Sequence, residues 1–257
     1  MNSISNSEHL VEIQDLHMVF KTRFHHDSMR DLFVSMLKDP LGNFLDSEER
    51  LHILKGINLK VKKGDIIGVL GVNGSGKTTL CRVISGTYFP TQGTVKTQGR
   101  VKAVFDTQIG INDELTGREN AFLLAALMYP DVENQEALVE EALEFSELGE
   151  FQNMPFKKYS KGMQARLFLS LISSLPSDVL VLDEVFDGAD LFFQEKVAKR
   201  VLKMIEQSGA VIFVSHSPER VFEVCNRVIV INDGQVAFDG DPKNGTDFYI
   251  GLKKLAR

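Results

Sequence analysis

The chain has 257 residues, of which 43% are hydrophobic and 25% charged, a composition typical of a folded globular protein. Its net charge of −6, with no long basic run, argues against nucleic acid as the main partner, because binding to a phosphate backbone needs a basic face. Two cysteines, Cys81 and Cys225, provide no disulfide framework and indicate a reduced compartment.

Neither a signal peptide nor a membrane-spanning segment is predicted. Met1–Glu8 carries no positive charge at its side chains and no apolar core. The best apolar run, Ala121–Tyr129, has about half of the ~20 residues that a bilayer requires. Any role at a membrane is therefore expected to come through a partner.

The N-terminal part predicts two strands separated by a long insertion. Leu10–Phe20 alternates apolar and polar residues, which predicts a strand or the edge of a strand pair. Met29–Lys38 has apolar residues at helical spacing before Asp39-Pro40, which predicts a short amphipathic helix. This helix either covers part of the core or meets a membrane surface or a partner. Leu41–Arg50 is expected to be a polar loop, and Ile53–Val61 a second strand.

A phosphate-binding loop is predicted next. After a turn at Lys62–Asp65, Ile66–Leu70 reads as a short buried strand, and a helical pattern begins near Lys77. The Gly-rich residues between them have P-loop spacing, in which glycines let successive N–H groups point into one nest at a helix N-terminus. Because a strand precedes and a helix follows, we favour this over a chance Gly-rich turn. The expected nucleotide-binding residues are Gly71, Val72, Asn73, Gly74, Ser75, Gly76, Lys77, Thr78 and Thr79.

The middle of the chain predicts a helical lobe that interrupts an α/β sheet. Thr94–Thr97 and Val101–Phe105 are expected to be short strands around a turn at Gln98-Gly99. Three helices follow with no strand between them. They are expected over Gly117–Tyr129 behind a Thr116/Glu119 capping box, from Asp131 to about Phe145, and from a cap at Ser160 to about Ser174.

The sheet resumes in the C-terminal part. Val179–Leu182 and Ala210–Val214 predict buried strands, with a helix over Asp190–Gln207 between them. Ser217, followed by proline, predicts the start of another helix. The last expected elements are a hairpin of Arg227–Ile231 and Val236–Phe238 around the turn Asn232–Gln235, and a helix over Thr246–Arg257.

Polar side chains that suit phosphate chemistry follow the two buried strands. Asp183 and Glu184 end the first, so both carboxylates reach the C-terminal edge of the sheet. We expect Asp183 and Thr78 to hold Mg²⁺, and Glu184 to polarise the water that attacks the γ-phosphate. His216 ends the second strand and is expected to contact a phosphate or orient Glu184. Lys77 is expected to reach the β- and γ-phosphates, which makes Glu184, His216 and Lys77 the candidate catalytic residues.

A second anion-binding turn is predicted in the helical lobe. Tyr159–Gln164 places a Ser-x-Gly turn at the N-terminus of the third lobe helix. One chain could hardly fold this turn and the P-loop onto a single phosphate, whereas two chains packed head to tail could. We therefore expect Ser160, Lys161 and Gly162 to bind the nucleotide that the P-loop of a second copy holds.

In the order of these motifs, the chain resembles the ABC transporter ATPases. P-loop, Q-loop, signature, acidic strand, D-loop and switch histidine follow one another over nearly the whole chain. The resemblance implies an α/β P-loop NTPase fold of the ABC ATPase type, with a mixed sheet, an antiparallel β edge and an inserted α-helical subdomain. It also implies ATP and Mg²⁺ as cofactors, and a homodimer that encloses two ATP molecules.

Three further positions are carried over from the family pattern. Gln108 is expected to be the Q-loop residue, which contacts the nucleotide and Mg²⁺, with Asp106 as the alternative. Asp190 is expected to be the D-loop residue at the nucleotide. Lys161 departs from the pattern, because Ser or Gly is usual there. The candidates for the aromatic residue that stacks on adenine are Phe20, Phe44 and His52.

A closer resemblance points to the branch that exports O-antigen, capsule and wall teichoic acid. It rests on Leu115–Asn120, Glu144–Glu150 and the Tyr-Ser-x-Gly-Met form of the signature. Members of this branch carry an N-terminal insertion similar to Met29–Lys38, described as a gate helix near the membrane. The resemblance implies a peripheral subunit at the cytoplasmic face of the inner membrane, bound to two integral-membrane permease subunits that move a lipid-linked glycan. Some members add a C-terminal carbohydrate-binding domain, for which this chain is expected to be too short.

A single ABC ATPase domain is expected over residues 1–257. Its RecA-like core would take about 1–112 and 177–257, its helical subdomain about 113–176, and its gate-helix-like insertion about 28–46. Two other functions stay open: a soluble ABC ATPase that acts on a ribosome, DNA or a protein complex, and an ABC exporter of a drug, lipid or other cargo.

Overall fold

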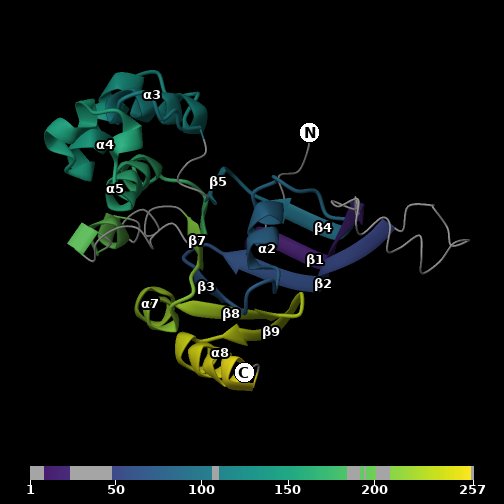
Figure 1. The fold of residues 1–257 in the computed structure, drawn as a ribbon. Helices are drawn as coiled ribbons and strands as arrows, with labels where there is room; N and C mark the ends of the chain where they lie inside the picture. The colour runs from purple at the N-terminus through teal and green to yellow at the C-terminus, as the bar shows by residue number, and fades with distance from the viewer. Residues whose placement is uncertain are drawn as a thin grey trace, which may run out of the picture.

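The computed structural model describes residues 9–23, 48–105, 110–183, 192–193, 195–200 and 209–255. It contains two sheets and a group of helices that stands to one side of them (Figure 1). The larger sheet has the order β5-β6-β7-β3-β8-β9, and its neighbours are parallel except for β8 and β9. Its strands are β3 Ile66–Leu70, β5 Val101–Val104, β6 Val179–Asp183, β7 Ala210–Val214, β8 Arg227–Asn232 and β9 Gln235–Gly240.

The central strands of this sheet are buried along their whole length. Every residue of β3, β6 and β7 is buried, as expected for parallel strands that are covered on both faces. Their alternate side chains enter two different hydrophobic clusters. One cluster surrounds helix α2 Lys77–Ile84, and the other extends into the lobe of helices.

The smaller sheet is antiparallel, with the order β2-β1-β4. Its strands are β1 His9–Arg23, β2 Glu48–Lys62 and β4 Gln92–Thr97. β1 is therefore the middle strand rather than an edge. Its apolar alternation shifts by one position between Ile13 and Leu16, where the register also shifts and Asp15 takes a φ of 47°. This bulge allows Val11, Ile13, Leu16 and Met18 all to be buried.

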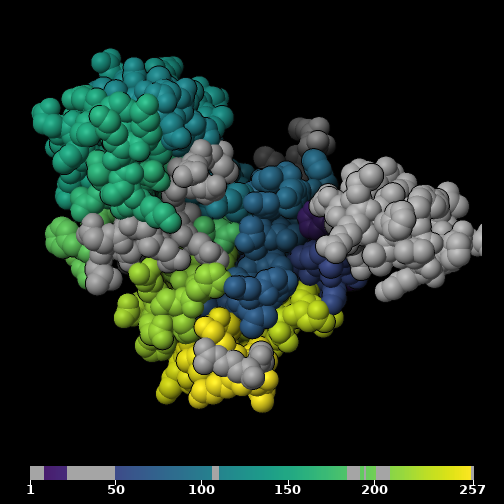
Figure 2. All heavy atoms as spheres, viewed as in Figure 1, coloured from purple at the N-terminus to yellow at the C-terminus, as the bar shows by residue number. Residues whose placement is uncertain are grey.

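The three predicted lobe helices are present and pack against one another to one side of the large sheet, with which they share a hydrophobic cluster (Figures 1 and 2). They are α3 Gly117–Met128, α4 Gln135–Ser146 and α5 Lys161–Ile172, and two short 3₁₀ segments, Gly149–Asn153 and Phe156–Lys158, lie between α4 and α5. Thr116 and Ser160 cap α3 and α5 as predicted. The predicted start of the second helix at Asp131 is wrong. The Asn134 side chain accepts a hydrogen bond from the Ala137 N–H at 3.0 Å and so begins α4 four residues later.

A buried lysine connects the lobe to the large sheet. Lys102 of β5 donates to the Leu175 carbonyl at 2.9 Å, and its ammonium lies 4.0 Å from the ring centroid of Tyr129. The Tyr129 hydroxyl donates in turn to the carbonyls of Leu171 and Ile172, at the end of α5. The C-terminal end of α5 is therefore connected to strand β5 of the large sheet through Tyr129 and Lys102.

The C-terminal elements agree with the prediction apart from one boundary. α7 Pro218–Val224 begins behind a Ser217 cap, and β8 and β9 form the predicted hairpin. The last helix, α8, covers Pro242–Leu255 and starts four residues before the predicted Thr246. The reason is Asp241, whose carboxylate accepts from the Asn244 N–H at 3.0 Å and supplies the N-terminal cap. Residues 192–193 and 195–200 are helical, within the helix predicted over 190–207.

One other expectation is corrected because strand pairing extends further than the local pattern shows. Glu48–Arg50, predicted as loop, belong to β2, whose ladder with β1 runs to the pair of Arg23 and Glu48. The strands predicted at Thr94–Thr97 and Val101–Phe105 are present as β4 and β5, and they join different sheets, β4 with β1 and β5 with β6. The predicted Met29–Lys38 helix lies outside the described residues. Within the part of the chain that is described, no helix combines the length and apolarity that crossing a membrane requires.

The first turn of α3 predicts a test of how the lobe is packed. A Cβ at Gly117 would clash with the buried Tyr159 side chain, whose hydroxyl donates to the Phe151 carbonyl at 2.8 Å. We expect Gly117→Ala to lower the free energy of unfolding by about 1–3 kcal/mol, measured by urea denaturation. Gly251→Ala is the control, because this exposed α8 position has no atom near a new Cβ, and it should stabilise by about 0.5–1 kcal/mol. Wild-type stability of Gly117→Ala would contradict this account of the packing.

Candidate nucleotide-binding site

The C-terminal ends of three parallel strands, β3, β6 and β7, are aligned at one edge of the large sheet. Asp183, the last residue of β6, pairs with Val214 of β7, which pairs with Val69 of β3. The P-loop follows β3, and His216 follows β7, so both leave the sheet beside Asp183. In open α/β sheets this carboxyl edge is where ligands bind. The structure therefore brings together three of the motifs that were found far apart in the sequence.

The two ends of the P-loop pass close to neighbouring strands. A Cβ at Gly71 would clash with the Ile231 carbonyl of β8 and would lie 2.5 Å from the Ser75 hydroxyl. Gly76 has a φ of 107°, and a Cβ there would lie 2.7 Å from Leu54 Cδ2 of β2. These positions need glycine because the backbone has no space for a side chain.

Lys77 is buried and folds back over the loop. Its ammonium donates to the carbonyls of Gly71 at 2.9 Å and Val72 at 3.2 Å, while the Ser75 N–H donates to Val72 at 3.1 Å. These bonds curl the loop into a compact cradle with Asn73 and Gly74 exposed at its tip. A positive charge is thus held at the cradle by the loop itself.

The backbone N–H groups at the N-terminus of α2 are not capped by a side chain and are available to bind an anion. Side chains cap α3, α4, α5 and α7, but no side chain caps α2, where Gly76 takes the cap position. The Ser75 hydroxyl is buried and has no hydrogen-bond partner among the described residues, and Thr78 and Thr79 are half-buried in the first turn. Uncapped N–H groups, hydroxyls and an ammonium are the donors that a nucleotide phosphate requires, so these residues fit the expected nucleotide.

Asp183 faces α2. It alternates along β6 with Val179 and Val181, and both of these lie in the hydrophobic cluster around that helix. The charges of Asp183 and Lys77 both act on Cys81 of α2, which agrees with this placement. Burial raises the pKa of the Cys81 thiol most, the negative charge of Asp183 raises it further, and the positive charge of Lys77 lowers it. A buried carboxylate and a buried ammonium therefore lie on the same side of the sheet, where Mg²⁺ and phosphate are expected.

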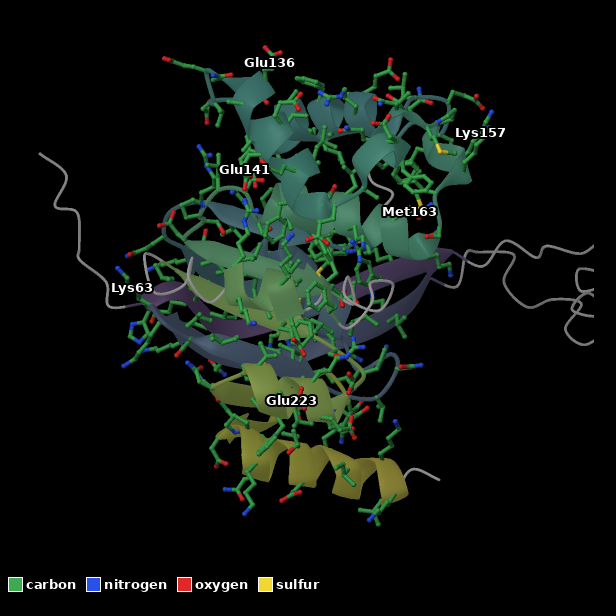
Figure 3. The ribbon with its side chains drawn as sticks, turned by 90° about the vertical axis from the view of Figure 1, so that its left-hand side faces the viewer. Lys63, Glu136, Glu141, Lys157, Met163 and Glu223 are labelled. Atoms are coloured by element: carbon green, nitrogen blue, oxygen red, sulfur yellow. The ribbon has the colours of Figure 1, made fainter. Side chains whose placement is uncertain are left out.

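His216 and the signature residues are exposed. His216 lies between β7 and the Ser217 cap of α7. Ser160 and Lys161 are exposed at the start of α5, where the Ser160 hydroxyl accepts from the Met163 N–H at 3.2 Å, and Gly162 is half-buried. In Figure 3, Met163 lies on the opposite side of the molecule from Lys63, which precedes β3. The start of α5 therefore faces the same side as the carboxyl ends of the strands.

The remaining predicted site residues are only partly tested by the geometry. Glu184, Gln108, its alternative Asp106, Asp190 and Phe44 lie outside the described residues. Of the other two adenine candidates, Phe20 packs edge-on against Tyr88 with ring centroids 5.6 Å apart, and exposed His52 places Nε2 3.1 Å from His17 Nδ1.

Sequence reasoning missed one contact of the cradle. The N–H of Gly234, in the turn between β8 and β9, donates to the Ser75 carbonyl at 3.2 Å. The Asn-Asp-Gly pattern predicts this turn but carries no signal of what the turn touches.

A loop of this kind between a buried strand and an uncapped helix defines a P-loop nucleotide-binding protein. Residues 54–187 match the ABC transporter family, and the chain belongs to that family. The fold and the family expected from the sequence are thereby confirmed.

Two relatives show the extent of the similarity. The O-antigen export system ATP-binding protein RfbB of Klebsiella pneumoniae is 36% identical over 196 residues, which cover 76% of this chain and 80% of that protein. The teichoic acids export ATP-binding protein TagH of Staphylococcus saprophyticus is 33% identical over 241 residues, covering 94% and 86%. Other relatives are longer: the chain spans 62% of the ABC transporter protein AbcA of Aeromonas salmonicida and 48% of TagH of Enterococcus faecalis.

Solved structures agree on the fold. A dimeric ATP-binding cassette, MJ0796, in a post-hydrolysis state with ADP and Pi, matches with a TM-score of 0.72 at 22% identity, over 90% of this chain and 98% of that one.

The buried thiols predict unreactive cysteines. Burial raises the pKa of Cys81 well above its ordinary value and that of Cys225 to about 12. Because the thiolate is the reactive form, we expect iodoacetamide at pH 8 to modify the folded chain at least about 100-fold more slowly than the urea-unfolded chain, measured by intact mass. Equal rates would show that at least one thiol is accessible and ionised in the folded state.

Proposed function

We propose that the protein is the ATP-hydrolysing subunit of an ABC transporter that exports a lipid-linked polysaccharide of the O-antigen, capsule or teichoic acid type. The proposal rests mainly on one observation. The C-terminal ends of β3, β7 and β6 are aligned in the sheet, so the P-loop, His216 and Asp183 all follow or end strands at the same edge. The names of the relatives, which are O-antigen and teichoic acid export proteins, support the polysaccharide cargo.

The binding part of the proposed reaction rests on the cradle. Lys77 reaches the β- and γ-phosphates of ATP, and the N–H groups of the loop and the start of α2 bind the α- and β-phosphates, which offsets the phosphate charge. The Thr78 hydroxyl, Asp183 and Gln108 hold Mg²⁺, which supplies further charge stabilisation when bound. The burial of Lys77 and Asp183 supports these roles, because charges act more strongly where water is excluded.

The hydrolytic part rests on the residues that follow the strands. Glu184, directly after Asp183, polarises the attacking water, and His216 contacts the γ-phosphate or orients Glu184. The strands that precede them in the chain, β6 and β7, are paired in register at Asp183 and Val214, which supports an assignment of both roles to this edge of the sheet.

We further propose that each complete site needs two molecules. Ser160, Lys161 and Gly162 of one copy, together with Asp190 near the interface, would close over the P-loop of the other. Exposure of Ser160 and Lys161, on the side to which the strands point, supports this arrangement. Closure around ATP would pull on two permease subunits, which hold the protein at the cytoplasmic face of the membrane.

The Ser160 cap predicts a variant that separates folding from catalysis. Aspartate caps helices as well as serine does, so Ser160→Asp should unfold like the wild type. Its carboxylate would repel the γ-phosphate of the facing copy, so we expect ATP hydrolysis to fall by about 100-fold, measured by phosphate release. Asn134→Asp at the α4 cap is the control and should keep full activity. Full activity of Ser160→Asp would remove Ser160 from the site.

The role of Glu184 predicts a trapped dimer. Glu184→Gln should lower hydrolysis by about 100-fold or more while ATP still binds, so an ATP-bound dimer should accumulate on size-exclusion chromatography. Exposed Glu223→Gln on α7 is the control (Figure 3). In the source organism, the same replacement of Glu184 should stop display of the surface polysaccharide and leave its lipid-linked precursor inside.

Unchanged hydrolysis by Glu184→Gln would refute its catalytic role. Unchanged surface polysaccharide, together with loss of another exported compound, would show a different cargo. Co-sedimentation of the trapped form with ribosomes or DNA would instead support a soluble ATPase function.

A further inference from the structure

The turn between β8 and β9 does not end in solvent. Asp233 and Gly234 have φ values of 46° and 76°, which is a two-residue hairpin turn of the kind that needs both central residues left-handed. The Asp233 side chain is exposed, but Gly234 is buried. Hairpin turns are usually exposed to solvent, so the burial of Gly234 means that other parts of the protein pack against the turn.

The partner is the P-loop on one side and β2 on the other. The Gly234 N–H donates to the Ser75 carbonyl at 3.2 Å, and the Gly234 carbonyl accepts from the Lys55 N–H at 2.8 Å. The Lys55 ammonium also lies 2.6 Å from the Asp233 carboxylate. The turn therefore bridges the small sheet and the phosphate cradle.

No other residue fits at the tip. A Cβ at Gly234 would clash with the Ile53 carbonyl of β2 and would lie 3.3 Å from Lys55 Cγ. Its left-handed φ already disfavours a side chain. Any substitution must push the turn away from β2, from the P-loop, or from both.

The bond to Ser75 controls an N–H of the cradle. The peptide between Ser75 and Gly76 is planar and trans, so its carbonyl and its N–H point in opposite directions. When Gly234 holds the carbonyl, the Gly76 N–H is fixed facing away from the turn. Gly76 is the N-terminal cap residue of α2, and no side chain caps this helix.

We propose that the β8–β9 turn is a positioning element for nucleotide binding, in which Gly234 fixes the Ser75–Gly76 peptide so that its N–H faces the phosphates. The inference rests on the proposed nucleotide site and adds a positioning residue about 160 positions away in the chain. Because a P-loop cradles the α- and β-phosphates, ADP and ATP should depend on the turn alike.

A matched pair of glycine variants tests this proposal. Gly234→Ala should weaken ADP binding by about tenfold, measured by calorimetry, because the cradle N–H is misplaced. Gly64→Ala is the control: its φ of 85° imposes the same strain, but no atom lies near a new Cβ. Gly64 precedes β3, at the opposite end of that strand from the P-loop, so this variant should leave ADP affinity unchanged. Without nucleotide, hydrogen exchange in residues 71–80 should be faster in Gly234→Ala only.

Wild-type protein provides a second measurement that needs no variant. Coupling between two sites is reciprocal, so ADP should slow amide exchange in peptides that cover 53–56 and 231–236 as well as the P-loop. If Gly234→Ala fails to fold, the amide exchange of the wild-type protein with and without ADP tests the positioning role by itself. Protection confined to 71–80, or wild-type ADP affinity of a folded Gly234→Ala, would overturn the positioning role and leave the nucleotide site intact. Failure of the wild type to bind ADP would instead refute the proposed function itself.

Discussion

The register of β6, β7 and β3 is the constraint on which the site depends. Because Asp183, Val214 and Val69 are aligned by the parallel ladder, the loops that follow these strands emerge beside one another. A slip of one residue would turn Asp183 from the α2 face to the lobe face. That slip is opposed by the apolar residues of both faces, since Val181 and Ile212 fit the cluster around α2, whereas Leu182 and Phe213 fit the other. The buried core thus sets the position of a carboxylate.

The conformation of the phosphate cradle depends on contacts from distant parts of the chain as well as on the residues of the P-loop itself. Its glycines allow it to pass against β2 and β8, and Lys77 holds two of its carbonyls. The β8–β9 turn adds a donor to Ser75 from the C-terminal part of the chain. Preorganised N–H groups need not rearrange when a phosphate arrives, which is the physical basis for tight binding at such loops.

Local patterns were sufficient where the physical cause is local. The P-loop, the Thr116 and Ser160 caps and the hairpin at Asp233-Gly234 each depend on a few neighbouring residues, and all were predicted. Errors arose where distant partners decide. Glu48–Arg50 were expected to be loop but are strand, because β1 extends far enough to pair with them. The two strands near 94 and 101 were predicted, but the sequence did not show that they join different sheets, β4 with β1 and β5 with β6. The contact of Gly234 with Ser75 spans the chain and has no local signature. The order of the motifs nevertheless predicted the family, because that order follows from the fold.

The central claim is that a complete site combines the cradle of one molecule with the start of α5 from another. Mixing two inactive variants, Lys77→Ala and Ser160→Asp, tests it most directly, with ATP hydrolysis as the readout. In a two-fold dimer, a mixed pair has one site with both defects and one site with neither. An equimolar mixture should therefore regain up to about a quarter of wild-type hydrolysis, since about half of the dimers are mixed. No recovery, although the two variants form mixed dimers, would show that each site is contained within one chain.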